Sequence, residues 1–541
     1  MESSISIVQA GLRCFNLVFA TDHEGGWKGV ISFHRFKQAA FFLFLSVWMF
    51  NLQGFALRAG AAKTSITPDV HAGKVYMAGF GFNRVATGVH DNLYARCLAM
   101  EAGGKTLVVC AADLIGLFHQ DVLKVRAKVK AQLPEVSQVI VASTHDHEGP
   151  DTLGLWGPAL LKSGVDVQYL NSVVNRIADT AVRAARNMRE ARLTLARDHS
   201  PLLRLLQGDS RPPYVKDPYL FAMRFVSAGT GRPIATLVNW SDHPETLDSR
   251  NTLITADYPH WLCQYVEEHD GGTAVFLNGS IGGLISTLGD QVSLLDTRTG
   301  QVAKDGTWEK AALAGNAVGE VAVRALRLNG RHFSVDRMVI RKTVTDIPLG
   351  NSVFRLDQGM GVFGPSRPVY TNGKPDPSTE EKPVSFLTRL VGDYVSPDEA
   401  AGIQKQLAGF KTVKYATGHD LRSEVDYIQL WDGNNLVAEI ATVPGEIYPE
   451  LVNGGITRYP GADFPDAPFE PVLRPRMKSR YQFIFGLAND EIGYLIPKAE
   501  WDNKAPWLLD RPHRWYGEIN SVGPEAAGAV TRALVRLMDE K

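Results

Sequence analysis

Short apolar runs alternate with stretches of helical period from about residue 63 onward. Residues 106–113 form an apolar run typical of a buried strand, and residues 120–132 follow with the spacing of an amphipathic helix. A second apolar, β-branched run begins at Val139 and ends just before His145. This order predicts an α/β protein with a mixed β-sheet core flanked by helices.

The same pattern continues toward the C-terminus. Residues 171–189 and 308–328 have helical period, residues 233–240 form another buried strand, and a last helix is expected over residues 525–537. Pro and Gly punctuate residues 355–395, which show no sustained period. We expect a loop-rich insertion there, either a lid or binding loop or a surface segment without a role in binding.

The N-terminal region resembles a secretory signal. Basic residues precede the apolar run 39–50, and the small-residue site Gly54-Phe55-Ala56 follows it. We therefore predict a leader over residues 1–56, a single domain over residues 57–541 and an exported protein, periplasmic or secreted. The run is shorter than the roughly 20 residues of a membrane-spanning helix, so anchoring by an uncleaved segment is the alternative. A start codon placed too far upstream would explain the long stretch before the apolar run.

Composition excludes some classes of partner and some types of metal site. The net charge is -1 and no stripe of Lys and Arg is interleaved with aromatic residues, so nucleic acid is not expected. A small amphiphilic substrate, with possible peripheral contact to a membrane, fits better, and the oligomeric state is not indicated. The 4 cysteines form no Cys-x-x-Cys pair. We therefore expect neither a thiolate zinc site nor a disulfide scaffold, and any metal must use His and carboxylate ligands.

Polar side chains with metal-binding chemistry follow three of the apolar runs. His145 and His147 are spaced by one residue after the Val139 run, which on a strand puts both imidazoles on one face. His243 follows the strand of residues 233–240, and Glu446 follows the run that begins at Ile440. Ligands gather at the carboxyl ends of strands in α/β sheets, so this pattern indicates a catalytic metal. A structural histidine and a helix-start carboxylate are the alternatives.

Several segments, taken in order, resemble the neutral/alkaline non-lysosomal ceramidase family. The similar segments are Ile66-Thr67-Pro68, Met77-Ala78-Gly79-Phe80, Thr144-His145-Asp146-His147-Glu148-Gly149-Pro150, Asp242-His243-Pro244, Ala256-Asp257-Tyr258, Val443-Pro444-Gly445-Glu446, Gly486 to Tyr494 and Asn520-Ser521-Val522-Gly523-Pro524.

The resemblance implies a ceramidase-like catalytic domain that binds one Zn²⁺ per chain. The implied ligands are His145, His243, Glu446 and Tyr494. A water in the open position would be acidified by the ion and would attack an amide carbonyl. The resemblance gives His147 a role as acid/base or oxyanion partner and not as a ligand.

Further site residues are implied by the same resemblance. Arg211 would orient a polar head group, and Tyr516 would polarise the substrate carbonyl together with backbone donors near Gly79. An alignment without gaps places Trp515 at the tyrosine position, so Tyr516 requires a one-residue shift.

Two aspartates occupy strand-end positions beside these segments. Asp113 and Asp257 would either orient the ligand histidines or cap helices.

The chain also departs from the family pattern. In the segment that resembles the family's serine motif, Gly283 stands at the aspartate position and Ile285 at the serine position, and Ser286 is the nearest hydroxyl. Covalent serine catalysis is therefore not expected, whereas hydrolysis by metal-activated water needs no such serine. We also expect no counterpart of the family's C-terminal immunoglobulin-like domain.

The sequence thus predicts a zinc-dependent hydrolase that cleaves the amide bond of an N-acylated, lipid-like substrate. The alternatives are a metal-dependent esterase or another amidase, or a binding protein that keeps the metal without catalysis. A metallo-β-lactamase is excluded because Gly149 and Pro150 replace its Asp-His pair. An amidohydrolase barrel would need an eight-fold βα repeat, which the pattern does not contain.

Overall fold

The computed structural model forms two units, residues 1–54 and residues 55–541. In the first unit it describes a short hairpin of β1 (Phe19–Thr21) and β2 (Trp27–Gly29). The signal-like residues 37–56 and Ser286 lie outside the described residues, so the predictions made for them stay predictions. No helix within the described part is long and apolar enough to cross a membrane. The described residues are 19–21, 27–29, 57–285, 292–364, 367–391, 404–405, 407–512 and 514–540.

The first part of the large unit builds a mixed sheet in the order β12-β10-β9-β8-β3-β5-β6-β7, with β15 paired to β8. The pairs β6–β7 and β10–β12 are parallel, and the other neighbours in the sheet are antiparallel. Its strands are β3 (Arg58–Ser65), β5 (Tyr94–Ala102), β6 (Lys105–Ala112), β7 (Gln138–Ser143), β8 (Arg189–Asp198), β9 (Leu220–Ser227), β10 (Pro233–Trp240), β12 (Thr273–Asn278) and β15 (Arg331–Phe333).

The later part builds a second sheet in the order β18-β17-β21-β22-β24, with β16 paired to β21. Its long antiparallel strands were not predicted from the sequence, whereas the strands β6, β7 and β10 of the first sheet were. The strands are β16 (Arg337–Pro348), β17 (Tyr370–Thr371), β18 (Lys374–Pro375), β21 (Asp420–Asp432), β22 (Asn435–Thr442) and β24 (Tyr481–Phe485).

The two sheets pack face to face over one shared apolar core. Phe221 and Leu237 of the first sheet belong to the same buried cluster as Ile428, Ile440 and Phe483 of the second. Alternate side chains of each strand point into this core. The predicted mixed sheet flanked by helices is confirmed, with a second sheet added as a further layer.

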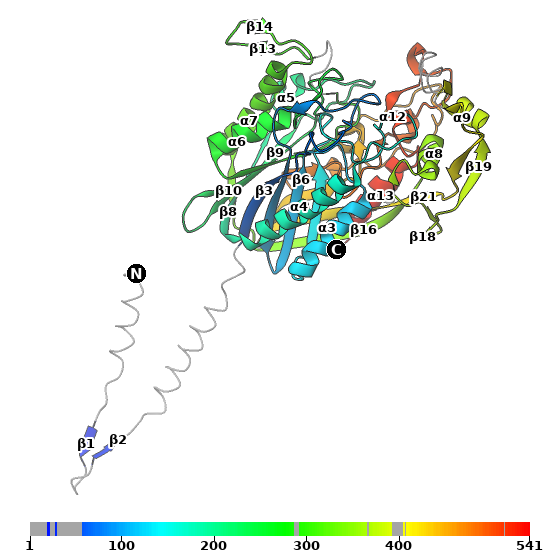
Figure 1. Cartoon of the computed structure of the whole chain (residues 1–541). Helices are drawn as coiled ribbons and strands as arrows, with labels where there is room; N and C mark the ends of the chain where they lie inside the picture. The colour runs from blue at the N-terminus through cyan, green and yellow to red at the C-terminus, as the bar shows by residue number, and fades with distance from the viewer. Residues whose placement is uncertain are drawn as a thin grey trace. The chain divides into compact units, whose positions relative to one another are not determined.

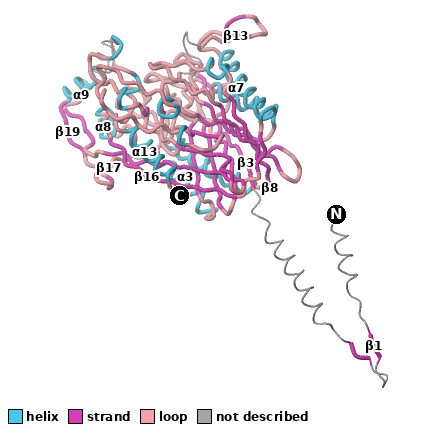
Figure 2. The backbone as a smooth tube through the Cα atoms, turned by 180° about the vertical axis from the view of Figure 1, so that it is seen from behind, coloured by secondary structure: helices cyan, strands magenta, loops and turns pink. Residues whose placement is uncertain are grey.

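Helices cover the outer faces of both sheets. Helices α3 and α4 lie over the part of the sheet formed by β3, β5, β6 and β7, and α6 and α7 lie over the part formed by β8, β9, β10 and β12 (Figure 1). On the second sheet α13 lies beside β16 (Figure 2). The long helix α4 starts where Asp166 accepts hydrogen bonds from two backbone amides, and its apolar face is buried. The helices are α3 (His119–Gln132), α4 (Val167–Arg186), α6 (Tyr258–Asp270), α7 (Trp308–Asn329) and α13 (Ala526–Asp539).

The segment predicted to be loop-rich, residues 355–395, contains regular structure. It includes most of helix α8 (Ser352–Met360), which Asn351 caps, and helix α9 (Val384–Val391). The two helices are short and Pro and Gly interrupt the sequence between them, so no sustained helical period marks them, and the loop-rich insertion stays a prediction.

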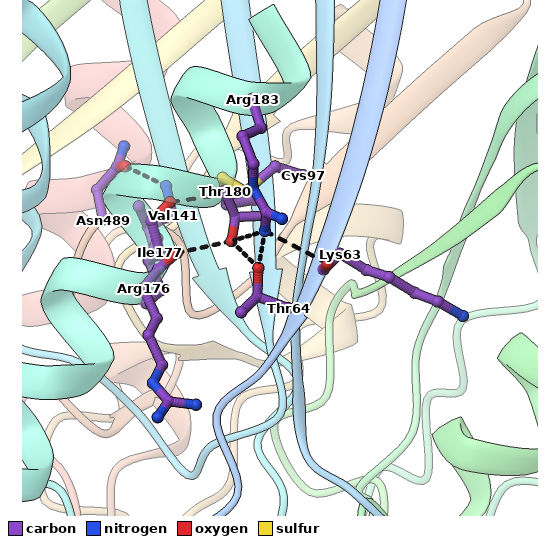
Figure 3. Close-up of a disulfide and its surroundings, with 10 residues drawn as sticks. Lys63, Thr64, Cys97, Val141, Arg176, Ile177, Thr180, Arg183 and Asn489 are labelled. Carbon is purple, nitrogen blue, oxygen red and sulfur yellow. Dashed lines mark hydrogen bonds between the residues drawn. A yellow bond between two sulfur atoms is a disulfide. The ribbon is translucent and has the colours of Figure 1, made fainter. Parts of the chain in front are cut away.

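One disulfide, Cys97–Cys110, joins neighbouring strands of the first sheet. The two cysteines face each other in the β5–β6 register, buried under α4 close to Ile177 (Figure 3). We expected no disulfide scaffold and did not predict this pair, because the pairing depends on the register of β5 against β6 and not on a spacing motif. Cys263 is buried and free.

Strand ends of the two sheets meet at one edge of the shared core. The backbone amide of Ser143, the last residue of β7, donates to the carbonyl of Leu487 at 3.1 Å. The amide of Gly486, after β24, donates to the carbonyl of Asn278 at the end of β12 at 2.9 Å. The segments that leave β7, β10, β22 and β24 therefore lie close together, and the candidate ligands lie in these segments.

Candidate metal centre

His145 and His243 come from the first sheet. His145 Nδ1 donates to the carbonyl of Ile115 at 2.8 Å, and His243 Nδ1 donates to the carbonyl of Leu284 at 2.5 Å. A carbonyl can only accept, so these bonds fix the proton on Nδ1 and leave Nε2 of each ring with a free lone pair. The backbone of His145 has φ of +67°, a left-handed conformation that is costly for a side-chain-bearing residue and is often found at functional sites.

Glu446 and Tyr494 come from the second half of the chain and lie opposite each other in the short parallel pair β23 (Glu446–Ile447) and β25 (Tyr494–Leu495). Glu446 Oε2 lies 2.9 Å from Nε2 of His243 and 3.4 Å from Nε2 of His145. The Tyr494 hydroxyl lies 3.3 Å from Nε2 of His243. The structure thus brings together all four residues for which the sequence suggested metal binding.

Gly493 allows this pairing to form. It has φ of +74°, and a Cβ at this position would lie 1.8 Å from the carbonyl oxygen of Asn520. Only glycine can occupy the position, so the turn that delivers Tyr494 depends on it.

His147 lies beside the same group. The nitrogen ligand atoms of His145, His147 and His243 all lie within 4.8 Å of one another, and all three side chains are buried, so this trio could bind a metal ion. His147 Nδ1 is 3.5 Å from Glu245 Oε2, and its ring packs so closely on Gly79 that a Cβ there would lie 2.4 Å away. The geometry therefore allows His147 either to bind the metal or to act beside it.

The electrostatics of the cluster favour a carboxylate among imidazoles. Burial acts to raise the pKa of Glu446, but His145 and His243 outweigh it and lower this pKa to about 2. Burial acts to lower the pKa of His243, and its hydrogen bond to Glu446 raises it. Burial, followed by the two neighbouring histidines, holds the pKa of His147 well below its usual value, so His147 is neutral near pH 7.

Arg84 holds the turn that carries the histidines. Its guanidinium is buried and donates to the carbonyls of Ala78, at 2.6 Å, and of His147, and Nη1 lies 3.3 Å from Glu148 Oε2. Arg84 was not predicted, because an isolated arginine in a loop carries no pattern that points to the turn.

An apolar pocket opens over the metal centre. The space in the pocket, counted together with its open mouth, is about 710 Å³. His145, His147, Glu446 and Tyr494 line it together with residues of α8 and the segment after it. The apolar lining residues are Ile115, Phe118, Leu153, Leu155, Trp156, Leu349, Phe354, Phe363, Leu421, Ile492 and Val522.

Tyr516, rather than Trp515, lines this pocket. Tyr516 begins helix α12 (Tyr516–Ile519), and its ring centroid lies 5.8 Å from that of Tyr494. Trp515 is buried and donates from Nε1 to Asp502 Oδ2 at 2.8 Å. The one-residue shift suggested by the motif comparison therefore agrees with the geometry.

Arg211 does not line the pocket. It is buried, and its Nη1 lies 2.6 Å from both carboxylate oxygens of Glu518, a residue of α12. Its guanidinium lies over the rings of Tyr448 and Trp515. It therefore holds the start of the helix that carries Tyr516, and its direct contact with a head group stays a prediction.

Asp113 and Asp257, suggested as partners of the ligand histidines, accept hydrogen bonds from backbone amides. Asp113 Oδ2 accepts from the amide of Tyr94 at 2.8 Å, and Asp257 caps α6. Backbone carbonyls orient both histidines instead, so the helix-cap alternative was right for Asp257. In the serine-motif segment, Leu284 supplies one of these carbonyls.

These features define a two-sheet α/β protein with a buried histidine cluster that could hold a metal. Residues 57–280 match the family model of the neutral/alkaline non-lysosomal ceramidase N-terminal domain, and the resemblance stated from the motifs is confirmed.

Among individual proteins, the chain is similar to the neutral ceramidase of Pseudomonas aeruginosa, with 28% identity over 253 residues. That match covers 43% of this chain and 37% of the relative's length. The crystal structure of neutral ceramidase from Pseudomonas aeruginosa superposes with a TM-score of 0.57 and 18% identity, over 90% of this chain and 74% of that one. A structure described as ceramidase complexed with C2 gives a TM-score of 0.60 and 18% identity, over 90% and 75%. At this identity the two structures establish the shared fold.

Proposed function

We propose that the protein is a zinc-dependent hydrolase that cleaves the amide bond of an N-acylated, lipid-like substrate of the ceramide type. The observation that carries the proposal is the convergence of His145, His243, Glu446 and Tyr494 beside an apolar pocket, which all of them except His243 line. The resemblance to the ceramidase family supports amide hydrolysis.

The donor set fits zinc. Two imidazole nitrogens with fixed tautomers, a carboxylate and a phenol oxygen are ligands that zinc accepts, and the carboxylate stays ionised among the histidines. When bound, zinc supplies Lewis acidity toward a carbonyl oxygen and lowers the pKa of a water molecule.

The chain's own residues then bind the substrate and move protons. His147 is neutral and buried beside Glu245, so one of its ring nitrogens accepts the proton of the attacking water and returns it to the leaving amine. Tyr516 donates a hydrogen bond to the carbonyl oxygen from the pocket side. Arg211 positions Tyr516 through Glu518, and the apolar walls hold a hydrocarbon chain and exclude water.

We further propose that the protein is exported. The signal-like segment before residue 57 and the buried Cys97–Cys110 disulfide both support this, because disulfides persist in oxidising compartments. Cell fractionation and N-terminal sequencing of the mature protein test it. Intact protein in the cytoplasm with reduced cysteines would contradict it.

The function is tested by measuring zinc per chain and the release of fatty acid from N-acyl lipids, before and after treatment with a chelator. We expect about one zinc per chain, release that stops on chelation and recovery on adding zinc. Bound zinc without hydrolysis of any amide would instead favour a metal-retaining binding protein, and release from esters alone would favour an esterase.

A further inference from the structure

The three histidines of the cluster differ in the groups that face their Nδ1 atoms. His145 and His243 donate from Nδ1 to backbone carbonyls, at 2.8 and 2.5 Å. His147 Nδ1 instead lies 3.5 Å from a carboxylate oxygen of Glu245. Glu245 is not among the residues that line the apolar pocket, so it has no direct contact with a substrate held there. Any effect of Glu245 on the chemistry must therefore pass through another residue.

Glu245 faces His147 because hydrogen bonds of the main chain join the two turns. The amide of His147 donates to the carbonyl of Pro244 at 3.1 Å, and the amide of Glu245 donates to the carbonyl of His243 at 3.1 Å. Both side chains are buried, with 6% of Glu245 and 4% of His147 exposed. The backbone therefore sets this contact, in contrast to an ion pair between two flexible surface side chains.

The ring of His147 is fixed as well. Gly79 packs so closely against it that a Cβ would lie 2.5 Å from Nδ1. The ring of Phe80 packs edge-on, with the ring centroids 5.2 Å apart, and Arg84 donates to the carbonyl of His147. These contacts keep the imidazole from turning, so Nδ1 stays toward Glu245 and Nε2 stays at the other edge of the ring.

Both ring nitrogens of His147 are buried, and neither has a hydrogen-bond partner in the part of the chain that the structure describes. At 3.5 Å the contact between Nδ1 and Glu245 is longer than a normal hydrogen bond. Hydrogen bonds between catalytic groups are often long before the substrate binds and shorten in the complex. A small movement of the Glu245 side chain brings the two atoms into hydrogen-bonding range.

This pairing selects one tautomer of His147. A carboxylate only accepts hydrogen bonds, so Glu245 favours the form with the proton on Nδ1. Nε2 then carries the lone pair and can accept a hydrogen bond from a water molecule beside the histidine cluster. A partner of this kind fixes both the tautomer and the orientation of an active-site histidine.

We propose that Glu245 is a positioning residue for the hydrolysis: it holds His147 in the Nδ1-protonated form and keeps the Nε2 lone pair available to the attacking water. This rests on the proposed function, because it assigns His147 to the water and not to the metal. Two consequences follow. Glu245 acts only through His147, and neither residue is needed to bind zinc.

Kinetics of the zinc-loaded, full-length protein test the first consequence, with N-dodecyloctanamide in detergent micelles as the probe. Glu245→Leu should lower kcat by about 10- to 100-fold, with KM and zinc content near the wild-type values. In the His147→Gln background the same change should cause no further loss. Asp248→Asn removes another carboxylate of the same loop and is the matched control, which should leave kcat within about 2-fold.

The tautomer is measured on metal-free protein, from the nitrogen NMR spectrum of histidine-labelled chains, with His147→Gln identifying the signals of His147. Wild-type protein should show a protonated Nδ1 and an unprotonated Nε2, and Glu245→Leu should move the proton toward Nε2. Glu245→Gln has the same shape and is used if Glu245→Leu does not fold. Its amide can donate as well as accept, so it should also weaken the preference for the Nδ1 proton.

The outcomes separate this inference from the proposed function. Loss of zinc from Glu245→Leu would make Glu245 a metal ligand, and an unchanged tautomer would leave the pairing without effect, so either result overturns the inference. Equal losses of kcat in the wild-type and His147→Gln backgrounds would overturn it too. If no variant cleaves the amide but the tautomer changes as expected, the hydrolase proposal fails while the pairing of Glu245 with His147 stands.

Discussion

The two sheets contribute differently to the same site. The first sheet lies largely within the segment that matches the ceramidase family model, residues 57–280, and supplies His145, His147 and His243. The second sheet and the segments around it lie outside that match and supply Glu446, Tyr494 and much of the pocket wall. The matched half therefore supplies the histidines of the candidate metal centre, and the other half supplies a carboxylate, a phenol and part of the pocket wall.

The largest expected effect comes from removing one proposed ligand from each half. His243→Ala and Glu446→Ala should each lose bound zinc and reduce amide hydrolysis by more than about 10³-fold, because the metal contributes several kcal/mol to the reaction. Metal analysis and fatty-acid release check this.

Trp515→Phe, beside the site but outside the pocket lining, is the matched control for ligand loss. If Glu446→Ala kept its zinc and its activity, the second half would not complete the centre, and the His145, His147 and His243 trio would become the better ligand set.

The described disulfide joins two strands of the first sheet and does not involve the second sheet. The double variant Cys97→Ala/Cys110→Ala should unfold more easily by about 3 kcal/mol, because the cross-link restricts the unfolded chain. Denaturant unfolding with and without a reducing agent measures the effect. Reductant should destabilise wild-type protein and the control Cys263→Ala alike, because both keep the disulfide, and should not affect the double variant. An unchanged unfolding midpoint in reductant would mean that the bond is not formed in solution.

Tyr516 tests the contribution of the second half to the chemical step. Tyr516→Phe should lower kcat by about 10²-fold, the usual result of losing one hydrogen bond to a developing oxyanion. Trp515→Phe should leave kcat within a few-fold. Equal effects of the two changes on kcat would place the carbonyl away from Tyr516.

The smallest expected effect concerns the metal-free protein. The pKa of Glu446 is depressed from 4.5 to about 2, so its contribution to the free energy of unfolding is present above pH 4.5 and lost as pH falls toward 2. The pKa of His243 is raised above 6.5, so its contribution is full below that pH and lost as pH rises through the raised value.

Metal-free protein should therefore gain stability from this pair between about pH 4.5 and 6.5. Unfolding of chelated protein across pH measures it. Glu446→Gln should remove the pH dependence of the free energy of unfolding in this range. If wild-type protein and Glu446→Gln gave curves of the same shape, the contact between Glu446 and His243 would not contribute to stability.

Much of the first sheet could be predicted from the sequence, and little of the second. The strands before His145 and His243 are short apolar runs with helices between them, so the local pattern reveals them. Strands β16 and β21 have mixed polarity because they alternate between the core and the solvent or helix α13, and their pairing is set by register over long range. Strand β5 was also missed, although it is buried on both faces, because Arg96 and Glu101 interrupt its apolar run, and the disulfide was missed with it.

Some residues of the candidate site could likewise be predicted from the sequence, and others could not. Glu446 and Tyr494 were predicted as ligands from the order of the family-like segments. The distance between them in the sequence does not by itself indicate that they lie together. Arg84 and Glu245 were not predicted, because their roles depend on buried contacts with His147, which is distant from both in the sequence. Arg211 was chosen for direct contact with substrate, and its bond to Glu518 could not be read from a loop arginine.

The core shared by the two sheets has a consequence for synthesis of the chain. When translation has reached only the end of β12, the second sheet has not been made. The apolar face that carries Phe221 and Leu237 is then exposed to solvent. We expect this nascent intermediate to be prone to aggregation and sensitive to proteases until β21, β22 and β24 pack against it.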